Sequence, residues 1–306
     1  MNSWHKQQWP LLGRWVSPKD KPMTLRKLAN ASFGAVPDVR TEAPAAAFKR
    51  WNPEVTNAAT TDNTISVLDV IGEDFWGEGV TAKRVSAALR SIGAQDVVVN
   101  INSPGGDFFE GLAIYNLLRD HPHKVTVKVL GMAASAASII AMAGDEIQIA
   151  RAGFLMIHNT QVVAAGDRNT MREIADWQET MDSVLADIYA YRVGIDRADV
   201  SAMLDAEEWF SGTRAVEAKF ADKLLDSDQV ETKSRNSADR QKVSLRMMDS
   251  LLAQAKQTRS ERRDILNDFK GAMRDAGPTG KQDAAVSEGL QSLLTQAKNM
   301  KGSQNG

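Results

Sequence analysis

The sequence predicts an α/β fold with a mainly parallel sheet, because strand-like and helix-like segments alternate between residues 64 and 158. The strand-like segments are rich in Val and Ile, and the helix-like segments carry apolar residues at helical spacing. Strands that alternate with helices form β-α-β units, in which the strands run parallel. The composition fits a globular protein, because 43% of the residues are hydrophobic and 25% are charged.

The first elements follow from side-chain type and turn residues. β-branched residues predict a strand over 64–72, and apolar positions at helical spacing before a glycine predict a helix over 81–93. A Val- and Ile-rich strand over 96–106 runs into a Pro-Gly-Gly turn. A helix over 109–121 and a strand over 124–131 follow. These segments alone give a β-α-β-α-β order.

The later elements complete the alternation and add one long helix. A helix is predicted over 135–144, two short strands within 146–158, and a helix over 170–194 in which Thr170 and Glu173 form a capping box. The long helix needs a partner surface, which is the rest of the chain or a second subunit. Its apolar stripe consists of Met171, Ile174, Trp177, Met181, Val184, Ile188 and Tyr191.

Charge and composition divide the chain into three segments. An N-terminal arm over 1–60 has 9 Lys and Arg against 4 Asp and Glu, and a C-terminal tail over 229–306 has 14 against 9. The core between them, 61–228, has 14 against 26, so we do not expect the core to bind nucleic acid. Both ends are expected to be poorly structured, with little core of their own. Amphipathic pieces of the tail lie near 244–256, 261–274 and 286–299.

Several classes of protein are excluded by composition. The chain has no cysteine, so it has no disulfide, thiolate metal site or thiol nucleophile. Its four histidines are scattered, and we expect no metal and no cofactor. The N-terminus shows no secretory signal, and the longest apolar run, 131–144, is shorter than the roughly 20 residues of a membrane span. We therefore expect a cytoplasmic protein without membrane contact.

Two glycine-containing turns carry the first chemical signals. In "INSPGGD" (101–107) a strand enters a turn whose glycines allow close approach of a substrate backbone and expose N–H groups. In "GMAASAASII" (131–140) Ser135 stands where a helix begins, near the positive end of its dipole. Taken alone, the first pattern favours an ordinary strand-to-helix turn, and the second is equally consistent with a capping or packing serine.

A base and an acid complete the set of candidates. His158 ends the apolar strand "FLMIH", and Asp205, Glu207 and Glu208 precede a later helix. A nucleophilic serine needs a base to take its proton, and the base needs an acid to orient it. The order of these pieces along the chain is more specific than any one of them.

The ordered set resembles the Clp-protease proteolytic-subunit family of serine peptidases over residues 64–228. The resemblance implies a ClpP/crotonase-like ββα spiral, a homo-oligomeric ring and protein substrates. "GMAASA" then assigns the nucleophile to Ser135 and not Ser138, and "LMIH" assigns the base to His158. The oxyanion hole is implied at the N–H groups of Gly106 and Ala136. The acid position carries Glu207 where the family has Asp, with Asp205 as the fallback.

The form "DAEEWFSG" and the long ends look more like the phage branch of this family, the head maturation (prohead) proteases. That resemblance implies that scaffold and capsid precursors are the substrates, in the host cytoplasm or inside the procapsid. Basic, loosely structured ends are accessible to self-cleavage, which we expect to remove them.

Other readings remain open at this point. A housekeeping-type Clp peptidase works with an ATP-driven unfoldase, and a Ser-Lys peptidase requires Lys83, Lys124 or Lys128 near Ser135. A crotonase-like enzyme acts on acyl-CoA, and it does not need Ser135 and His158 together. A non-catalytic scaffold or procapsid shell component is the alternative outside enzymes.

Overall fold

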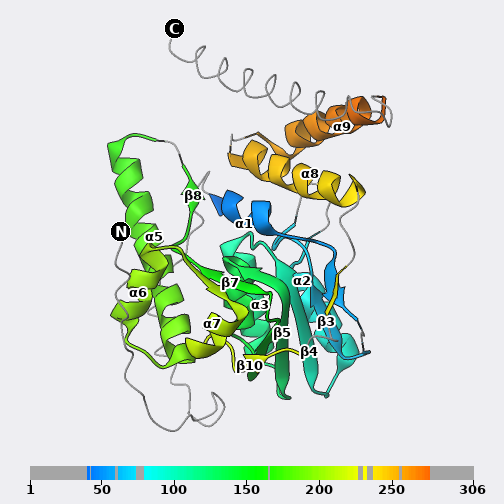
Figure 1. The fold of residues 1–306 in the computed structure, drawn as a ribbon. Helices are drawn as coiled ribbons and strands as arrows, with labels where there is room; N and C mark the ends of the chain where they lie inside the picture. The colour runs from blue at the N-terminus through cyan, green and yellow to red at the C-terminus, as the bar shows by residue number, and fades with distance from the viewer. Residues whose placement is uncertain are drawn as a thin grey trace, which may run out of the picture. The chain divides into compact units, whose positions relative to one another are not determined.

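The central sheet of the protein is mainly parallel, which confirms the predicted α/β class. The computed structural model describes residues 40–41, 43–58, 61–73, 79–164, 166–226, 230–232, 237–254 and 257–275, all within Ala35–Gly306. In this sheet β10, β6, β5, β4 and β3 lie side by side and run parallel, and β7 joins β5 to the antiparallel β9 (Figure 1). The strands are β3 (Thr64–Val67), β4 (Val97–Ser103), β5 (Val125–Ala134), β6 (Glu146–Ile149), β7 (Phe154–Ile157), β9 (Glu208–Ser211) and β10 (Lys223–Leu224).

Strand β5 is the centre of the arrangement because it has two successive neighbours along one edge. Its first half pairs with β6 over Thr126–Val129, and its last residues, Met132–Ala134, pair with β7. The strand is therefore longer than the predicted 124–131. Gly131 lies where β5 changes from β6 to β7 as its neighbour. A larger residue would not fit there, because a Cβ on Gly131 would lie only 2.8 Å from Oδ1 of Asn102. The predicted first strand is shorter than expected and ends at Val67.

The helices pack in chain order around this sheet. Helix α3 packs between α2 and α4, and α5 packs against α4 and α6. Their bounds are α2 (Ala82–Ile92), α3 (Phe108–Arg119), α4 (Ala136–Ala141), α5 (Arg168–Val193), α6 (Arg197–Asp205) and α7 (Gly212–Glu217). The buried side chains of these helices and the sheet form one hydrophobic core.

The long helix α5 differs from its prediction at the cap and along its buried face. The predicted capping box of Thr170 and Glu173 is wrong, because the Asp167 carboxylate caps the helix and accepts the N–H groups of Asn169 and Thr170. The buried face also deviates from the predicted stripe, since Leu185 and Tyr189 are buried while Met171 and Tyr191 are each 38% exposed.

The described end of the N-terminal arm packs on the sheet. It contains β1 (Arg40–Thr41), α1 (Ala45–Arg50) and β2 (Val55–Asn57); β1 pairs with β8 (Val162–Val163), and β2 pairs with β11 (Val230–Thr232). Phe48 and Trp51 are buried with Met132 and Met156, and the Trp51 indole N–H donates to the Asn102 carbonyl at 3.0 Å. The described part of the arm therefore buries its apolar side chains against β5 and β7. The predicted segment boundaries at 60 and 228 stay predictions.

Two of the three predicted amphipathic pieces of the tail lie in long helices, and the third, 286–299, lies outside the described residues. Helices α8 (Ser237–Gln254) and α9 (Arg259–Asp275) share a small apolar cluster of Leu245, Met248, Leu266 and Phe269. The guanidinium of Arg246 on α8 forms a buried ion pair with Asp69 at 3.1 Å. Helix α8 is therefore anchored through Arg246 to the segment that follows β3.

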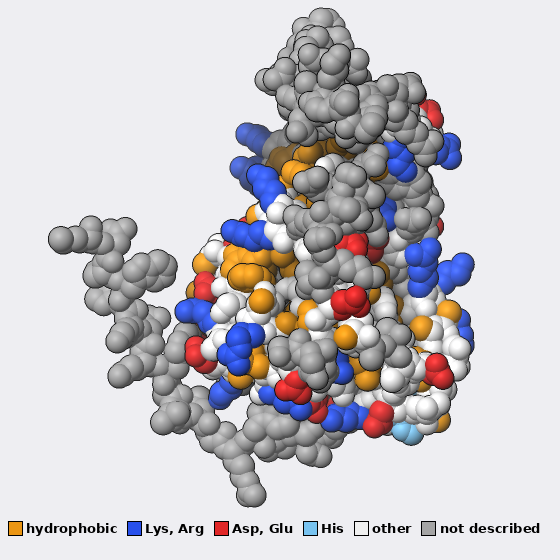
Figure 2. Space-filling view, turned by 45° about the vertical axis from the view of Figure 1, so that its right-hand side comes forward, with side chains coloured by type: hydrophobic (Ala, Val, Ile, Leu, Met, Phe, Trp, Pro, Cys, Tyr) orange, Lys and Arg blue, Asp and Glu red, His pale blue; other side chains and the backbone are white. Residues whose placement is uncertain are grey.

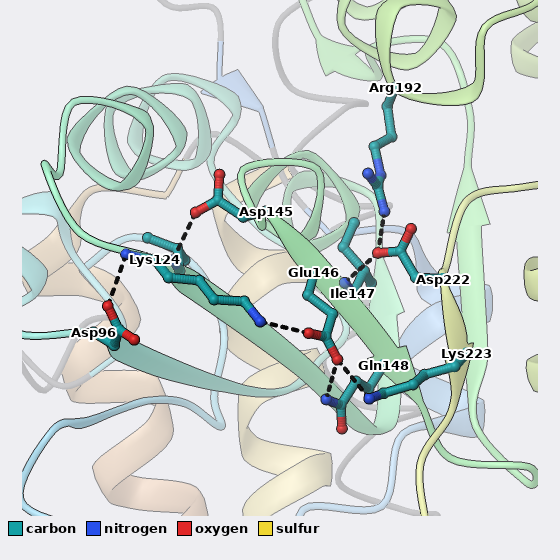
Figure 3. Close-up of polar contacts among 10 residues, drawn as sticks. Asp96, Lys124, Asp145, Glu146, Ile147, Gln148, Arg192, Asp222 and Lys223 are labelled. Carbon is teal, nitrogen blue, oxygen red and sulfur yellow. Dashed lines mark hydrogen bonds and ion pairs between the residues drawn. The ribbon is translucent and has the colours of Figure 1, made fainter. Parts of the chain in front are cut away.

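A network of charged side chains ties together the amino ends of the parallel strands (Figure 3). Glu146 at the start of β6 accepts hydrogen bonds from Lys124 at 2.6 Å and from Lys223 at 2.7 Å. These hydrogen bonds lower the pKa of Glu146 to about 2. Arg192 of α5 pairs with Asp222 at 2.6 Å beside the same edge. This edge lies opposite the carboxyl ends of the strands, where α/β proteins place their sites.

Surface charge and helix composition place few limits on function. Lys and Arg side chains lie among Asp and Glu side chains over the face shown in Figure 2, so charges of both signs are interspersed there. None of the helices in the described part of the chain combines the length and apolar character needed to cross a membrane.

Candidate active site

Ser135 lies at a sharp turn between the end of β5 and the start of α4. Its φ is 54° and its ψ is −126°, a conformation that a residue with a Cβ rarely adopts. Its side chain makes no capping hydrogen bond to the helix. The serine is therefore not a helix cap, and the strained turn points to a role for its hydroxyl.

The pairing of β5 with β7 brings Ser135 and His158 together. Ala134 lies opposite Met156, and the Ser135 N–H donates to the Met156 carbonyl at 3.0 Å. His158 follows β7 directly, as Ser135 follows β5. The His158 Nε2 atom lies 2.7 Å from the Ser135 Oγ atom. Two residues 23 positions apart thus form the hydrogen bond that a serine nucleophile and its base require.

The Ser135 carbonyl is held by hydrogen bonds from within α4. It accepts the Ser138 N–H at 2.8 Å and the Ser138 hydroxyl at 2.6 Å. The single hydroxyl hydrogen of Ser138 goes to that carbonyl, so the Tyr189 hydroxyl, 2.7 Å away, donates to the Ser138 oxygen. Burial raises the pKa of Tyr189 far above its usual value, which keeps this donor protonated. Ser138, which the motif does not assign as the nucleophile, thus supports the strained turn.

The Gly105–Gly106 turn lies directly against Ser135. A Cβ on Gly105 would be 2.7 Å from the Cβ of Ser135, and a Cβ on Gly106 would be 2.1 Å from the carbonyl oxygen of Ile71. Both glycines have positive φ, 97° and 148°. Only glycine fits this approach. Gly106 and Ala136 both line the cavity beside Ser135, where the sequence places the oxyanion donors.

His158 is buried, with 7% of its surface exposed. This burial lowers the pKa of His158 to about 4, and the nearby negative charge of Glu207 opposes the shift. The imidazole is therefore neutral at pH 7 and able to accept a proton at Nε2. Its other nitrogen, Nδ1, is buried without a hydrogen-bond partner among the described residues.

The candidate acids lie near His158 without a hydrogen bond to it. Glu207 stands between α6 and β9 with φ 49°, and its carboxylate accepts the Trp209 indole N–H at 3.2 Å. Asp205 ends α6 and accepts a hydrogen bond from the Asn159 side chain at 2.6 Å. The negative charge of Glu207 acts on His158 and opposes the lowering of its pKa. The assignment of the acid stays a prediction.

The cavity beside Ser135 is small, with a volume of about 20 Å³. Phe108, Ile139 and Leu185 form an apolar part of its wall, and Thr41 and Thr160 are polar members. No lysine is among the described residues that line it. Lys124, one of the three lysines considered for a Ser-Lys mechanism, pairs instead with Glu146 at the opposite edge of the sheet.

Several cavity residues were not identified from sequence, and two of them come from distant parts of the chain. Thr41 belongs to the arm, and Tyr189 belongs to α5 and lies more than 50 residues after Ser135. Neither lies in a motif, so only the folded chain brings them to the site. Within the described ranges, no three His, Asp or Glu side chains cluster in a way that could hold a metal ion.

Sequence comparison identifies the family of the chain. Residues 55–228, more than half of the chain, match the family described as Clp protease. ATP-dependent Clp protease proteolytic subunit 1 of Streptomyces avermitilis is 29% identical over 155 residues, which cover 48% of this chain and 71% of that protein. The match to the family, over residues 55–228, spans β2 to β10 and includes Ser135, His158 and Glu207.

Two further relatives illustrate the range of the similarity. Subunit 3 of the ATP-dependent Clp protease of Rhodococcus jostii is 28% identical over 136 residues, 44% of this chain and 67% of that protein. Among solved structures, a ClpP1 variant of Listeria monocytogenes is 22% identical with a TM-score of 0.47, over 54% of this chain and 92% of that one.

Proposed function

The chain belongs to the Clp protease family, with its ClpP-like α/β fold, and we propose that it is a serine endopeptidase whose nucleophile is Ser135. The observation that supports this proposal most strongly is the 2.7 Å contact between the Ser135 Oγ and His158 Nε2 atoms at a strained turn. A packing serine needs neither the strain nor a buried neutral imidazole beside it.

The proposed reaction is acyl transfer from a peptide to Ser135 and then to water. His158 Nε2 accepts the Ser135 hydroxyl proton as Oγ attacks the peptide carbonyl carbon. The N–H groups of Gly106 and Ala136 hold the oxyanion, and His158 returns the proton to the leaving amine. A water molecule then attacks the acyl-enzyme by the same route, which releases the second product and restores Ser135.

Glu207 is the proposed orienting acid. A carboxylate on Nδ1 would hold the imidazole with its hydrogen on that atom and stabilise the imidazolium that forms during attack. Nδ1 is buried and has no partner in the described residues, and Glu207 carries the charge that acts on His158. For this role the Glu207 carboxylate must turn from the Trp209 indole to His158.

We propose that the substrates are scaffold and capsid precursors of a phage head, cut by a homo-oligomeric ring in the host cytoplasm or procapsid. The form of the acid segment and the basic arm and tail support this role. A second candidate is a housekeeping-type Clp peptidase that needs an ATP-driven unfoldase, which the names of the relatives favour. Cleavage of a loosely folded protein such as casein without ATP or unfoldase would support the first role over the second.

Fluorophosphonate labelling tests the peptidase proposal. The reagent should modify Ser135 in the wild type, located by peptide mass spectrometry, and should fail with Ser135→Ala and His158→Ala. Matched controls are Ser86→Ala on α2 and His121→Ala, whose side chain bonds the Gln95 carbonyl; both should label normally. Absence of label on folded, assembled protein would contradict the proposal and favour the non-catalytic shell component.

Self-cleavage of the ends is tested separately by intact mass. The wild type should lose mass with time as its arm and tail are cut, while Ser135→Ala should keep its full mass. Identical and unchanging masses for the two proteins would exclude self-cleavage.

A further inference from the structure

The described end of the arm lies across the candidate active site. Strand β1 runs antiparallel to β8, with Arg40 opposite Val163 and Thr41 opposite Val162. β8 begins four residues after His158, and Thr160 and Gln161 between them line the cavity. Arg40–Thr41 therefore lies along the segment that leaves the site, in an extended conformation.

Thr41 bridges the two sides of the site. Its backbone belongs to the β1–β8 pair, while its hydroxyl accepts the Phe108 N–H at 2.9 Å and donates to the Asp107 carboxylate at 3.1 Å. Asp107 and Phe108 directly follow Gly106, on the side of the proposed oxyanion hole. Thr41 is 7% exposed and lines the cavity together with Ser135 and His158.

Little room remains in the cavity that Thr41 lines. Its volume of about 20 Å³ is close to the volume that one water molecule requires. The Ser135–His158 hydrogen bond is nevertheless formed. The reactive pair is thus assembled while Thr41 of the arm forms part of the wall of its small cavity.

An extended peptide binds a protein strand through main-chain hydrogen bonds, in the way that β1 binds β8. We propose that Arg40–Thr41 occupies the place of an extended polypeptide substrate beside β8, so that the arm is a built-in competitive inhibitor of this site. This inference rests on the proposed peptidase function. Substrate enters when β1 leaves β8 and the Thr41 hydroxyl leaves Asp107 and Phe108.

Two variants change the strength with which β1 is held beside β8, in opposite directions. Thr41→Val keeps the side-chain shape and removes both hydroxyl hydrogen bonds, so β1 is held less strongly. The double variant Arg40→Cys with Val163→Cys locks β1 to β8 through a disulfide, because these residues are direct partners across antiparallel strands. The chain has no cysteine of its own, so no other thiol competes.

The readout is the rate at which a fluorophosphonate modifies Ser135 in the full chain. Thr41→Val should react roughly three- to tenfold faster than the wild type. The oxidised cysteine pair should react about tenfold or more slowly than its reduced form, and dithiothreitol should restore the rate. Thr180→Val on α5, outside the cavity, should react as the wild type does, and each single cysteine variant should react at the same rate with and without oxidant.

The failures of this inference and of the peptidase function are distinguishable. If the cross-linked protein reacts as fast as the reduced protein, or if the pair does not cross-link under oxidant, the inhibitor role is overturned and the peptidase function stands. If the wild type, Thr41→Val and the reduced pair all leave Ser135 unmodified, the peptidase function fails and this inference fails with it.

Discussion

The Glu207 carboxylate accepts a hydrogen bond from the Trp209 indole at 3.2 Å, on the strand that pairs with β7. The Nδ1 atom of His158 meanwhile lies buried without a partner among the described residues. A buried N–H without a partner is costly, and the charge of Glu207 is the electrostatic contribution that acts on this imidazole. The two facts together predict that Glu207 changes partner during the reaction.

Replacement of Glu207 by glutamine tests its proposed role. Glu207→Gln should lower kcat by more than about tenfold, because a neutral amide does not stabilise the imidazolium that forms during attack. The pKa of His158, followed by NMR of the free protein, should fall further, since Glu207 is the charge that opposes its depression. Asp205→Asn is the matched control and should change neither quantity. If Asp205→Asn lowers kcat and the His158 pKa while Glu207→Gln changes neither, the orienting acid is Asp205.

Replacement of Trp209 by phenylalanine tests whether the indole holds Glu207 away from His158. Trp209→Phe keeps an aromatic ring beneath the Arg50 guanidinium, which lies 4.2 Å from the ring centre, and removes the indole N–H. The freed carboxylate should turn to His158, so the pKa of His158 and kcat should both rise. An unchanged pKa would show that the indole does not compete for Glu207.

Tyr189 is expected to stabilise the turn that carries Ser135, through its hydrogen bond to Ser138. Tyr189→Phe leaves the Ser138 oxygen without its donor, which should lower the free energy of unfolding by about 1 kcal/mol. Because Ser138 holds the Ser135 carbonyl, kcat should fall severalfold while KM stays constant. Tyr191→Phe, on the same helix and 38% exposed, is the control and should resemble the wild type. Equal kcat for both variants would limit Tyr189 to packing.

Ser135 and His158 were assigned from the order of the motifs along the chain and their resemblance to the Clp-protease family, because neither local pattern alone is specific. The sequence also predicted the parallel sheet, since the alternation of segments requires no knowledge of contacts far apart in the chain. The meeting of the two residues depends on β5 taking β7 as its second neighbour, and no local pattern encodes that pairing.

The errors and omissions follow from the same limit. The capping box at Thr170 failed because the helix is capped three residues earlier, by the Asp167 carboxylate, which accepts the Thr170 N–H that the box would have paired with Glu173. The predicted apolar stripe on α5 was wrong in part, because the surrounding helices decide, together with the spacing, which face of α5 is buried. Thr41 was unpredictable because an isolated threonine in a polar arm carries no signal for the cavity that it lines.

The depressed pKa of His158 predicts how activity and stability depend on pH. The pKa of the His158 imidazole is about 4 in the folded protein, against 6.5 for an ordinary histidine, and burial is the main cause. The base stays neutral above the folded pKa, so the acid limb of kcat/KM should lie near pH 4. A limb near pH 6.5 would contradict the burial of this imidazole.

The same shift predicts a loss of stability on mild acidification. Below pH 6.5 the unfolded chain binds a proton at His158 that the folded chain rejects, so this residue destabilises the fold as pH falls towards 4. His158→Gln removes the titration, so urea unfolding of this variant should lose less free energy between pH 7 and pH 5 than the wild type does. His121→Gln, at an exposed site that bonds Gln95, is the control and should follow the wild type. Equal losses for His158→Gln and the wild type would show that the buried imidazole does not set the pH dependence.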